Sequence, residues 1–306
     1  MTTLRVANAP CSWGVLEFDD ADGGLLAGPS PDCDQVLREI RSAGFVGTEL
    51  GDWGFMPTEP GPLRDLLQQH QLAMLAAFVP VALKDAAAHR AGVDEAVRTA
   101  RLLASVNSEA FIVLADDNGT VEERTRLAGR IGSEQGLDAR EWALFAQGAE
   151  SVARAVLDET GLRTVFHFHC AGYVETPAEL RELMARTDPG LLGLCFDTGH
   201  YAYGGGDPVA GLREHADRVW HVHFKDRHPK VASQAQQSGW DYFQAVGSGV
   251  FCELGEGDVD FPGVLAELEA MNYDGWIVVE QDVLPGMGSP LESAVRSRRY
   301  LQELGL

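Results

Sequence analysis

Basic residues are scarce in this chain of 306 residues, which contains 24 Lys and Arg against 46 Asp and Glu. The formal net charge of −22 gives a surface that repels the phosphates of DNA and RNA and the anionic headgroups of membranes. No local cluster of Lys and Arg offsets this balance. The composition therefore argues against nucleic-acid and membrane partners and indicates a well-solvated acidic surface.

Cysteines are also few, and none of the five forms a CxxC pair. An odd count without pairing spacing does not indicate a disulfide framework, so we expect a cytoplasmic protein. The segment "MTTLRVANAP" lacks the apolar core of a secretion signal, and no run approaches the roughly 20 apolar residues of a membrane span. Apolar residues nevertheless make up 45% of the chain, which is enough for a large core.

Short apolar runs rich in strand-forming residues alternate with longer amphipathic segments. The runs that we expect to form strands are 4–9, 47–50, 72–79, 110–115, 163–169, 191–197, 218–224 and 275–281. Eight strand–helix units predict a single (β/α)₈ TIM barrel domain over residues 1–306. The alternative is a doubly wound open sheet, which normally has a glycine-rich phosphate loop after its first strand. The segment "NAPCSWG" is not such a loop.

Ionisable side chains gather at the ends of the last four expected strands, where barrels of this type carry their active sites. The run "TVFHFHCAG" places His167 and His169 two residues apart, so that a strand points both imidazoles to one face. The following strands end in "FDTGH", "HVHFKD" and "VVEQD". Polar groups inside apolar strands are costly unless they are paired or ligated. Any one of them could be structural, but their joint occurrence predicts a divalent metal site, for which imidazole and carboxylate suit Mn²⁺, Co²⁺, Fe²⁺ or Zn²⁺.

Seven motifs occur in order over nearly the whole chain: "NAPCSWG", "GTELG", "HFHCAGYVET", "CFDTGHYAYGGGDP", "HVHFKD", "GEGDVDF" and "GWIVVEQD". This set resembles the xylose-isomerase-like barrels of the sugar phosphate isomerase/epimerase superfamily, and within it the inosose dehydratases of myo-inositol breakdown. The resemblance implies a metal-dependent lyase that dehydrates a cyclic polyol ketone such as 2-keto-myo-inositol. It also implies one divalent ion, with Mn²⁺ or Co²⁺ preferred and Zn²⁺, Fe²⁺ or Mg²⁺ as alternatives.

The resemblance further implies which side chains hold the ion. In the family, one ligand comes from each of the last four strands, and the matching positions here are His167, Asp197, His223 and Glu280. Many members have a glutamate where this chain has His167, and that glutamate often serves as an acid or base. The histidine argues against the alternative function, a metal-dependent sugar epimerase or isomerase, including the hydroxypyruvate type, which shuttles a proton between two carboxylates.

Dehydration needs a base that removes the proton next to the carbonyl and an acid that protonates the leaving hydroxyl. We expect Glu280 or a neighbouring metal-bound water to act as the base. The candidate acids are His169, His200, His221 and Lys225, and histidine is favoured because its pKa lies near 7. Lys225 is better suited to binding a substrate oxygen or a neighbouring carboxylate.

Three further residues are candidates for contact with the substrate, and each has a structural alternative. Trp13 could form an apolar wall or be a core residue, Glu49 could bind hydroxyls or form an ion pair, and Lys84 could reach the pocket or be a solvated loop residue. The segment 227–258 is the widest stretch without strong periodicity, and it is long enough to cover the site as a lid.

Two other classes of function remain open at this point. A sugar-binding barrel without chemistry would bind no metal. An apurinic endonuclease on the same barrel would need several metals and a DNA-binding face, against which the net charge argues. The sequence leaves the oligomeric state open, including a homo-oligomer, and indicates a small polyol or sugar-like substrate.

Overall fold

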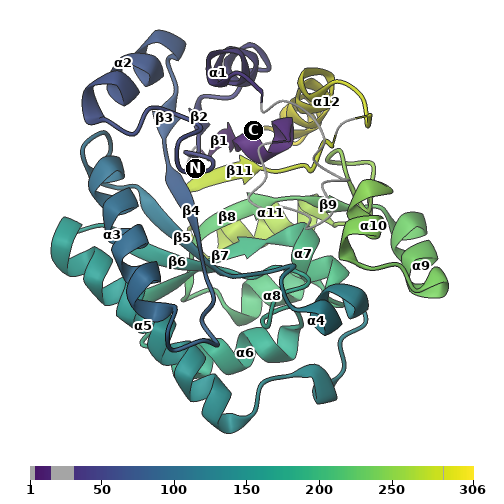
Figure 1. The fold of residues 1–306 in the computed structure, drawn as a ribbon. Helices are drawn as coiled ribbons and strands as arrows, with labels where there is room; N and C mark the ends of the chain where they lie inside the picture. The colour runs from purple at the N-terminus through teal and green to yellow at the C-terminus, as the bar shows by residue number, and fades with distance from the viewer. Residues whose placement is uncertain (1–3, 15–30, 285) are drawn as a thin grey trace.

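The computed structural model describes residues 4–14, 31–284 and 286–306 (Figure 1). Its main sheet has nine parallel strands in the order β3-β2-β1-β11-β8-β7-β6-β5-β4. These strands are β1 (Arg5–Asn8), β2 (Gly47–Thr48), β3 (Ala73–Met74), β4 (Ala76–Val81), β5 (Phe111–Asp116), β6 (Arg163–His167), β7 (Leu192–Asp197), β8 (Val219–Phe224) and β11 (Trp276–Val279). All eight predicted strand segments are found among them.

Leu75 closes the sheet into a barrel, because it is the single residue between β3 and β4. Its amide donates to the carbonyl oxygen of Thr48 on one side, and its carbonyl oxygen accepts from the amide of Phe111 on the other, both at 2.9 Å. β3 and β4 therefore act as one strand, which gives eight strands around the barrel. The predicted (β/α)₈ barrel is confirmed.

Helices surround the strands (Figure 1). The expected helical segments correspond to α1 (Cys33–Ser42), α2 (Pro60–His70), α3 (His89–Ala104), α5 (Ala139–Thr160), α6 (Pro177–Arg186), α8 (Pro208–Glu214), α11 (Phe261–Ala270) and α12 (Pro290–Glu303). Short connections add the helices α4 (Glu122–Leu127) and α7 (Thr198–Tyr203), and the 3-10 turns Pro10–Trp13 and Ser133–Gln135.

The longest of these helices, α5, shows how local sequence sets the boundaries. Asp138 and Glu141 form a capping box at its start, where each side chain accepts a backbone N–H of the other residue. Gly161 ends the helix in the left-handed region at φ 75°, which glycine adopts without strain. Between them, apolar residues at helical spacing face the barrel: Trp142, Phe145, Ala149, Val152 and Val156.

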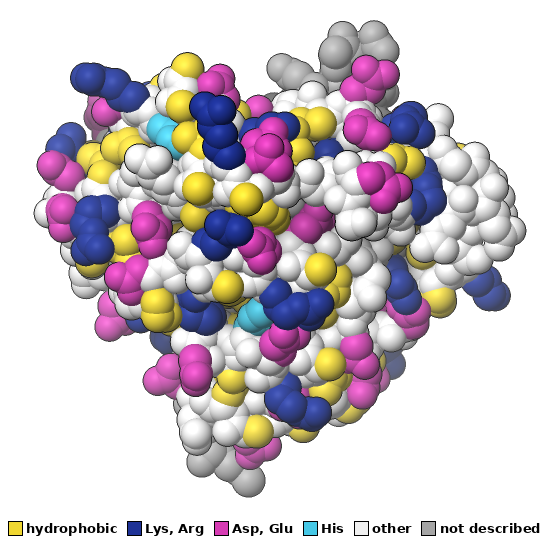
Figure 2. Space-filling model, turned by 90° about the horizontal axis from the view of Figure 1, so that it is seen from below, with side chains coloured by type: hydrophobic (Ala, Val, Ile, Leu, Met, Phe, Trp, Pro, Cys, Tyr) yellow, Lys and Arg dark blue, Asp and Glu magenta, His cyan; other side chains and the backbone are white. Residues whose placement is uncertain are grey.

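Two features of the described residues bear on possible membrane and nucleic-acid partners. Among the described residues, no helix combines the length and the apolar character needed to cross a bilayer. Figure 2 shows one face of the molecule, on which Lys and Arg side chains are interspersed with Asp and Glu.

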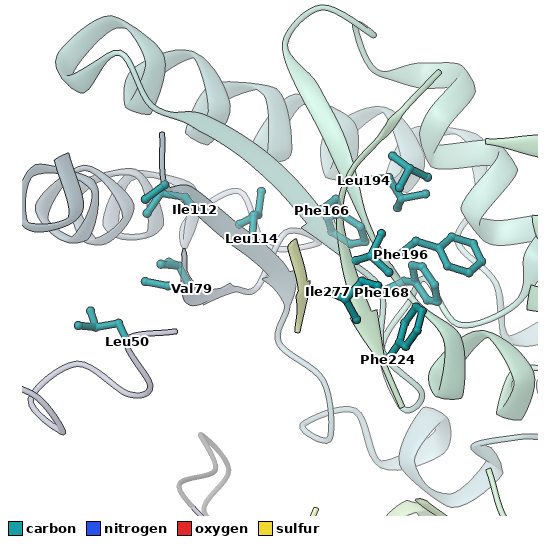
Figure 3. Close-up of a cluster of buried hydrophobic side chains, with 14 of the residues drawn as sticks. Leu50, Val79, Ile112, Leu114, Phe166, Phe168, Leu194, Phe196, Phe224 and Ile277 are labelled. Atoms are coloured by element: carbon teal, nitrogen blue, oxygen red, sulfur yellow. The ribbon is translucent and has the colours of Figure 1, made fainter. Parts of the chain in front are cut away.

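Alternation along the strands separates the apolar packing from the ionisable groups. Phe166 and Phe168 pack outside the barrel wall with Phe196 and Phe224 (Figure 3). His167 lies between Phe166 and Phe168 and therefore points inward, where it contacts His223 of β8. A strand period of two thus explains why a buried run carries two histidines that alternate with phenylalanines. The phenylalanines build the core, and the imidazoles line the barrel interior.

The segment 227–258 is more regular than predicted. It contains β9 (Asp226–Arg227), α9 (Pro229–Ser238), α10 (Tyr242–Gly247) and β10 (Phe251–Cys252). The apolar positions of α9 are small, with Ala232 and Ala235 buried, which explains why the sequence showed little periodicity. These helices are held by tertiary packing in a cluster that includes Tyr203, Tyr242 and Phe251.

Asp226 organises the loop that carries "GEGDVDF". Its carboxylate accepts backbone N–H groups from Arg227, Gly255, Gly257 and Val259 at 2.8–3.1 Å. A Cβ at Gly257 would lie 2.2 Å from a carboxylate oxygen of Asp226, so glycine is required for this close approach. The motif therefore acts as a ring of backbone donors around one buried acid.

We expect Asp226→Ala to lower the free energy of unfolding by about 3 kcal/mol. The buried N–H of Val259 then loses its acceptor at a cost of about 1–3 kcal/mol, and the three partly buried N–H groups cost less because water can replace the carboxylate. Urea unfolding monitored by circular dichroism measures this change. The matched control is Asp258→Ala, which removes a surface ion pair with Arg227 and should cost less than about 1 kcal/mol. Equal losses in the two variants would contradict the role assigned to Asp226.

Candidate metal centre and active-site cavity

Four side chains from adjacent strands converge inside the carboxyl end of the barrel. His167 ends β6, Asp197 ends β7, His223 lies in β8 and Glu280 follows β11, and their ligand atoms all lie within 4.8 Å of one another. Nδ1 of His223 lies 3.0 Å from Nε2 of His167 and 3.1 Å from Oε1 of Glu280. Asp197 and His223 are direct partners in the pairing of β7 with β8, so the register itself brings them together.

Asp197 supplies the observation that tests whether a cation fits. Its Oδ1 accepts the backbone N–H of His200 at 2.7 Å, but its buried Oδ2 has no hydrogen-bond partner. Burial raises the pKa of Asp197 to about 6. A buried carboxylate oxygen without a donor is costly, and a divalent cation would supply the missing partner. The set of two imidazoles and two carboxylates suits such an ion.

Cys195 belongs to a second group of potential ligands, with His167 and His223. Burial raises the pKa of its thiol to about 12. A thiol binds metal as the thiolate, which is disfavoured here, so the carboxylate-containing set is the better site.

The ammonium of Lys225 and the carboxylate of Glu280 form a buried ion pair beside this group, at 3.3 Å. Burial alone lowers the pKa of Lys225, but Asp282 and Glu280 outweigh this effect and raise it well above its usual value. Burial likewise raises the pKa of Glu280, but His223 and Lys225 bring it well below its usual value. Both groups are therefore charged at neutral pH.

The other imidazoles of the cluster are neutral. Burial lowers the pKa of His169 to about 3, with a further contribution from Lys225. Burial also lowers the pKa values of His167 and His200 well below the usual range. The rings of His167 and His169 stack with centroids 4.0 Å apart, which two imidazolium ions would resist. None of the three is a ready proton donor near pH 7.

A cavity opens above the cluster. It is lined by Ala9, Pro10, Cys11, Glu49, Gly51, Asp52, Phe78, His169, His200, Lys225, Tyr242, Glu280 and Asp282. Tyr242 belongs to α10, so the segment 227–258 does contribute to the wall of the site. Phe251 reinforces that wall, because its ring packs on His200 and Lys225.

Eight lining residues were not among the predicted site residues: Ala9, Pro10, Cys11, Gly51, Asp52, Phe78, Tyr242 and Asp282. Cys11 and Asp282 stand in the quoted motifs "NAPCSWG" and "GWIVVEQD", so position after a strand could have identified them. Phe78 and Tyr242 have no comparable signal, because an aromatic residue in a strand or helix is usually a core residue.

Three of the residues predicted to be catalytic or to bind substrate do not line the cavity. The Nε2 of His221 faces Glu49 at 2.8 Å, and its ring borders a separate cavity at the opposite end of the barrel. This placement does not support His221 as the acid. Trp13 is buried and donates to Glu39, and Lys84 pairs with Glu141 at 3.0 Å, so the structural alternatives fit both.

Glu175 holds the loop that follows β6 and carries His169. Its carboxylate accepts the backbone N–H groups of Ala171 and Gly129 at 2.8 and 2.7 Å. Ala171 has φ 70°, an unusual conformation for a residue with a Cβ. Burial raises the pKa of Glu175 to about 7, against the opposing effect of the two backbone donors.

Comparison with known proteins identifies relatives along the whole chain. The family model "Xylose isomerase-like TIM barrel" matches residues 37–304. The inosose dehydratase of Geobacillus kaustophilus is 33% identical over 304 residues, which cover 98% of this chain and 94% of the relative. The inosose dehydratase of Lactiplantibacillus plantarum is 32% identical over 303 residues and 97% of both chains.

Solved structures share the fold at low sequence identity. The "IOLI protein with a binding zinc atom" superposes with a TM-score of 0.67 at 14% identity, covering 98% of both chains. At this identity the likeness shows the common barrel alone.

We expect the ionisation of Glu175 to lower the free energy of unfolding of the wild type as the pH rises. The folded protein holds its proton up to about pH 7 while the unfolded chain releases it near 4.5, so the free energy of unfolding falls across this window. Glu175→Gln lacks this titration. The wild type should therefore lose about 2 kcal/mol relative to the variant between pH 5 and pH 8.

Urea unfolding of the metal-free proteins at both pH values measures this difference. Glu182→Gln is the matched control, since Glu182 lies on the exposed face of α6. The difference in free energy of unfolding between this variant and wild type should be the same at pH 5 and pH 8. A constant difference for Glu175→Gln as well would contradict a raised pKa.

Proposed function

The chain belongs to the xylose isomerase-like TIM barrel family, and from this membership we propose that it is a metal-dependent hydro-lyase that dehydrates a cyclic polyol ketone of the inosose type. The observation that carries the proposal is the convergence of four ligand atoms beside a cavity that contains a buried ammonium group. The inosose dehydratases that match nearly the whole chain support the substrate class.

His167, Asp197, His223 and Glu280 hold one divalent ion in this proposal, with Mn²⁺ or Co²⁺ as the first candidates and Zn²⁺, Fe²⁺ or Mg²⁺ as alternatives. When bound, such an ion polarises the ketone and acidifies the neighbouring C–H. Burial would lower the pKa of His223, but Cys195, Glu280 and Glu49 raise it well above its usual value. His223 must therefore release a proton when it becomes a ligand.

Glu280 is the base. It lines the cavity, and its carboxylate is ionised at neutral pH, so it is able to accept the proton from the carbon next to the ketone. The remaining imidazoles of the cavity wall, His169 and His200, are neutral and serve to hold substrate hydroxyls by hydrogen bonds.

Lys225 is the acid, in place of the histidine that the sequence favoured. It carries an ammonium proton into the cavity, whereas the neighbouring imidazoles are unprotonated. Lys225 gives that proton to the leaving hydroxyl, which departs as water while the enol rearranges to the dione. Its Nζ lies 3.3 Å from Oε2 of Glu280, so the proton taken from carbon returns directly to the lysine. The two residues are then restored with net loss of one water.

The alternative, an epimerase or isomerase, would return a proton to the substrate from a second carboxylate. The corresponding position on β6 is the neutral imidazole of His167, which does not supply one. The substrate in this proposal is a small polyol ketone, with no nucleic-acid or membrane partner. A cytoplasmic location accords with five cysteines that are all free.

We expect two histidines of β6 and its following loop to differ in their effect on metal binding. His167→Ala should weaken Co²⁺ binding about 100-fold or more, since Nε2 of His167 belongs to the ligand group. His169→Ala should change the affinity less than about threefold, because its ring stacks on His167 without joining that group. Isothermal titration of the metal-free proteins measures both, and equal losses would show that the roles are misassigned.

The reaction itself is tested with 2-keto-myo-inositol and Mn²⁺ or Co²⁺ in D₂O. We expect loss of one water and an ultraviolet-absorbing dione, identified by mass spectrometry. Lys225→Met should lower turnover by about 10²–10⁴-fold as an acid is removed. Recovery of a stereoisomer or ketose isomer carrying solvent deuterium, without loss of water, would refute dehydration and favour the epimerase alternative.

A further inference from the structure

Glu49 lies behind the metal ligands, at the end of β2. Its Oε1 is 3.0 Å from Nε2 of His223 and 2.8 Å from Nε2 of His221. All three side chains are buried, with at most 5% of each exposed. Strand β2 is far from β8 in the order of the sheet, so this contact crosses the barrel interior.

The two ring nitrogens of His223 face opposite sides. Nδ1 lies among the ligand atoms of His167 and Glu280, and Nε2 points at Glu49. A neutral imidazole has one N–H and one lone pair, so Nδ1 is available to a metal only when the proton is on Nε2. That proton needs an acceptor in a buried site, and the Oε1 of Glu49 is placed to be one.

We propose that Glu49 is a positioning residue that sets the tautomer and ring orientation of His223, and that His221 in turn holds Glu49 in place. The proposal rests on the ligand set given under Proposed function. Glu49 also lines the cavity, so this role stands beside the predicted contact with the substrate. Both hydrogen bonds that the described structure gives to the Glu49 carboxylate come from imidazoles on β8.

His221 contributes a second donor to the same oxygen. With two N–H groups converging on Oε1, the Glu49 carboxylate cannot rotate without losing both hydrogen bonds. This accounts for a histidine on β8 that does not reach the cavity. Partners of this kind behind a metal ligand typically alter metal affinity by 10–100-fold.

The same three side chains form a group that could hold a second ion. For that, Nε2 of His223 would have to be a ligand at the same time as Nδ1, so the ring would lose both protons. One acceptor oxygen that faces two N–H donors is instead typical of a hydrogen-bond network. The geometry therefore favours the positioning role of Glu49 over a second metal site. The number of ions bound distinguishes the two.

The test compares Glu49→Ala and Glu49→Gln with wild type by isothermal titration of the metal-free proteins with Co²⁺. We expect wild type to bind one ion and Glu49→Ala to bind about 10–100-fold more weakly. Glu49→Gln keeps an acceptor oxygen and should show a smaller loss. In the Zn²⁺-loaded wild type, long-range ¹H–¹⁵N spectra should show His223 as the Nε2–H tautomer.

Asp282→Asn is the matched control, because it removes one negative charge from the same cavity without a contact to either histidine of β8. The Co²⁺ affinity of Asp282→Asn should change less than about threefold. If Asp282→Asn lost as much affinity as Glu49→Ala, the loss of one negative charge would explain both results. Unchanged affinity in Glu49→Ala, or two ions in wild type, would overturn the proposal.

Asp197→Ala separates this inference from the proposed function. If that variant also keeps full affinity, the ligand set itself is wrong. If it loses the ion while Glu49→Ala does not, only the positioning role fails.

Discussion

Negative charge buried at the carboxyl end of the barrel must be balanced largely by neighbouring side chains, because burial leaves little of it in contact with solvent. Glu49, Asp197, Glu280 and Asp282 each expose less than a tenth of their surface, and Lys225 is buried among them. One ammonium and one imidazolium are too few to balance four carboxylates, and the free Oδ2 of Asp197 marks where the positive charge is short. The proposed metal site and the high pKa of Lys225 both accord with this imbalance.

Burial and the neighbouring charges also divide the ionisable groups of the cavity into charged and neutral ones. Lys225 and Glu280 stabilise each other in their charged forms, while burial keeps His169 and His200 neutral. A histidine cluster thus provides polar groups without adding charge, and in the proposed mechanism the ion pair of Lys225 and Glu280 carries out the acid–base steps. A bound divalent cation would lower the pKa values of the nearby imidazoles still further, which strengthens this division.

Two other buried carboxylates position the loops around the cavity by collecting backbone N–H groups. Asp226 gathers four of them around the motif "GEGDVDF", and Glu175 gathers two at the loop that carries His169. In both cases a single acid substitutes for the regular hydrogen bonds that a strand or helix would provide. The cavity walls therefore depend on side chains that do not touch the substrate.

Much of this could be predicted from the sequence, because periodicity and residue type are local properties. The strand period of two placed Phe166 and Phe168 outside and His167 and His169 inside, and the order of the motifs indicated the barrel and the candidate ligands. The helices of segment 227–258 were not predictable, since small residues such as Ala232 and Ala235 give little periodic signal and depend on tertiary packing. The proposals that Glu49 supports His223 and that Lys225 carries the proton rest on contacts that only the tertiary structure shows. These outcomes depend on distances and desolvation between strands that are far apart in the chain, and barrel closure alone sets both.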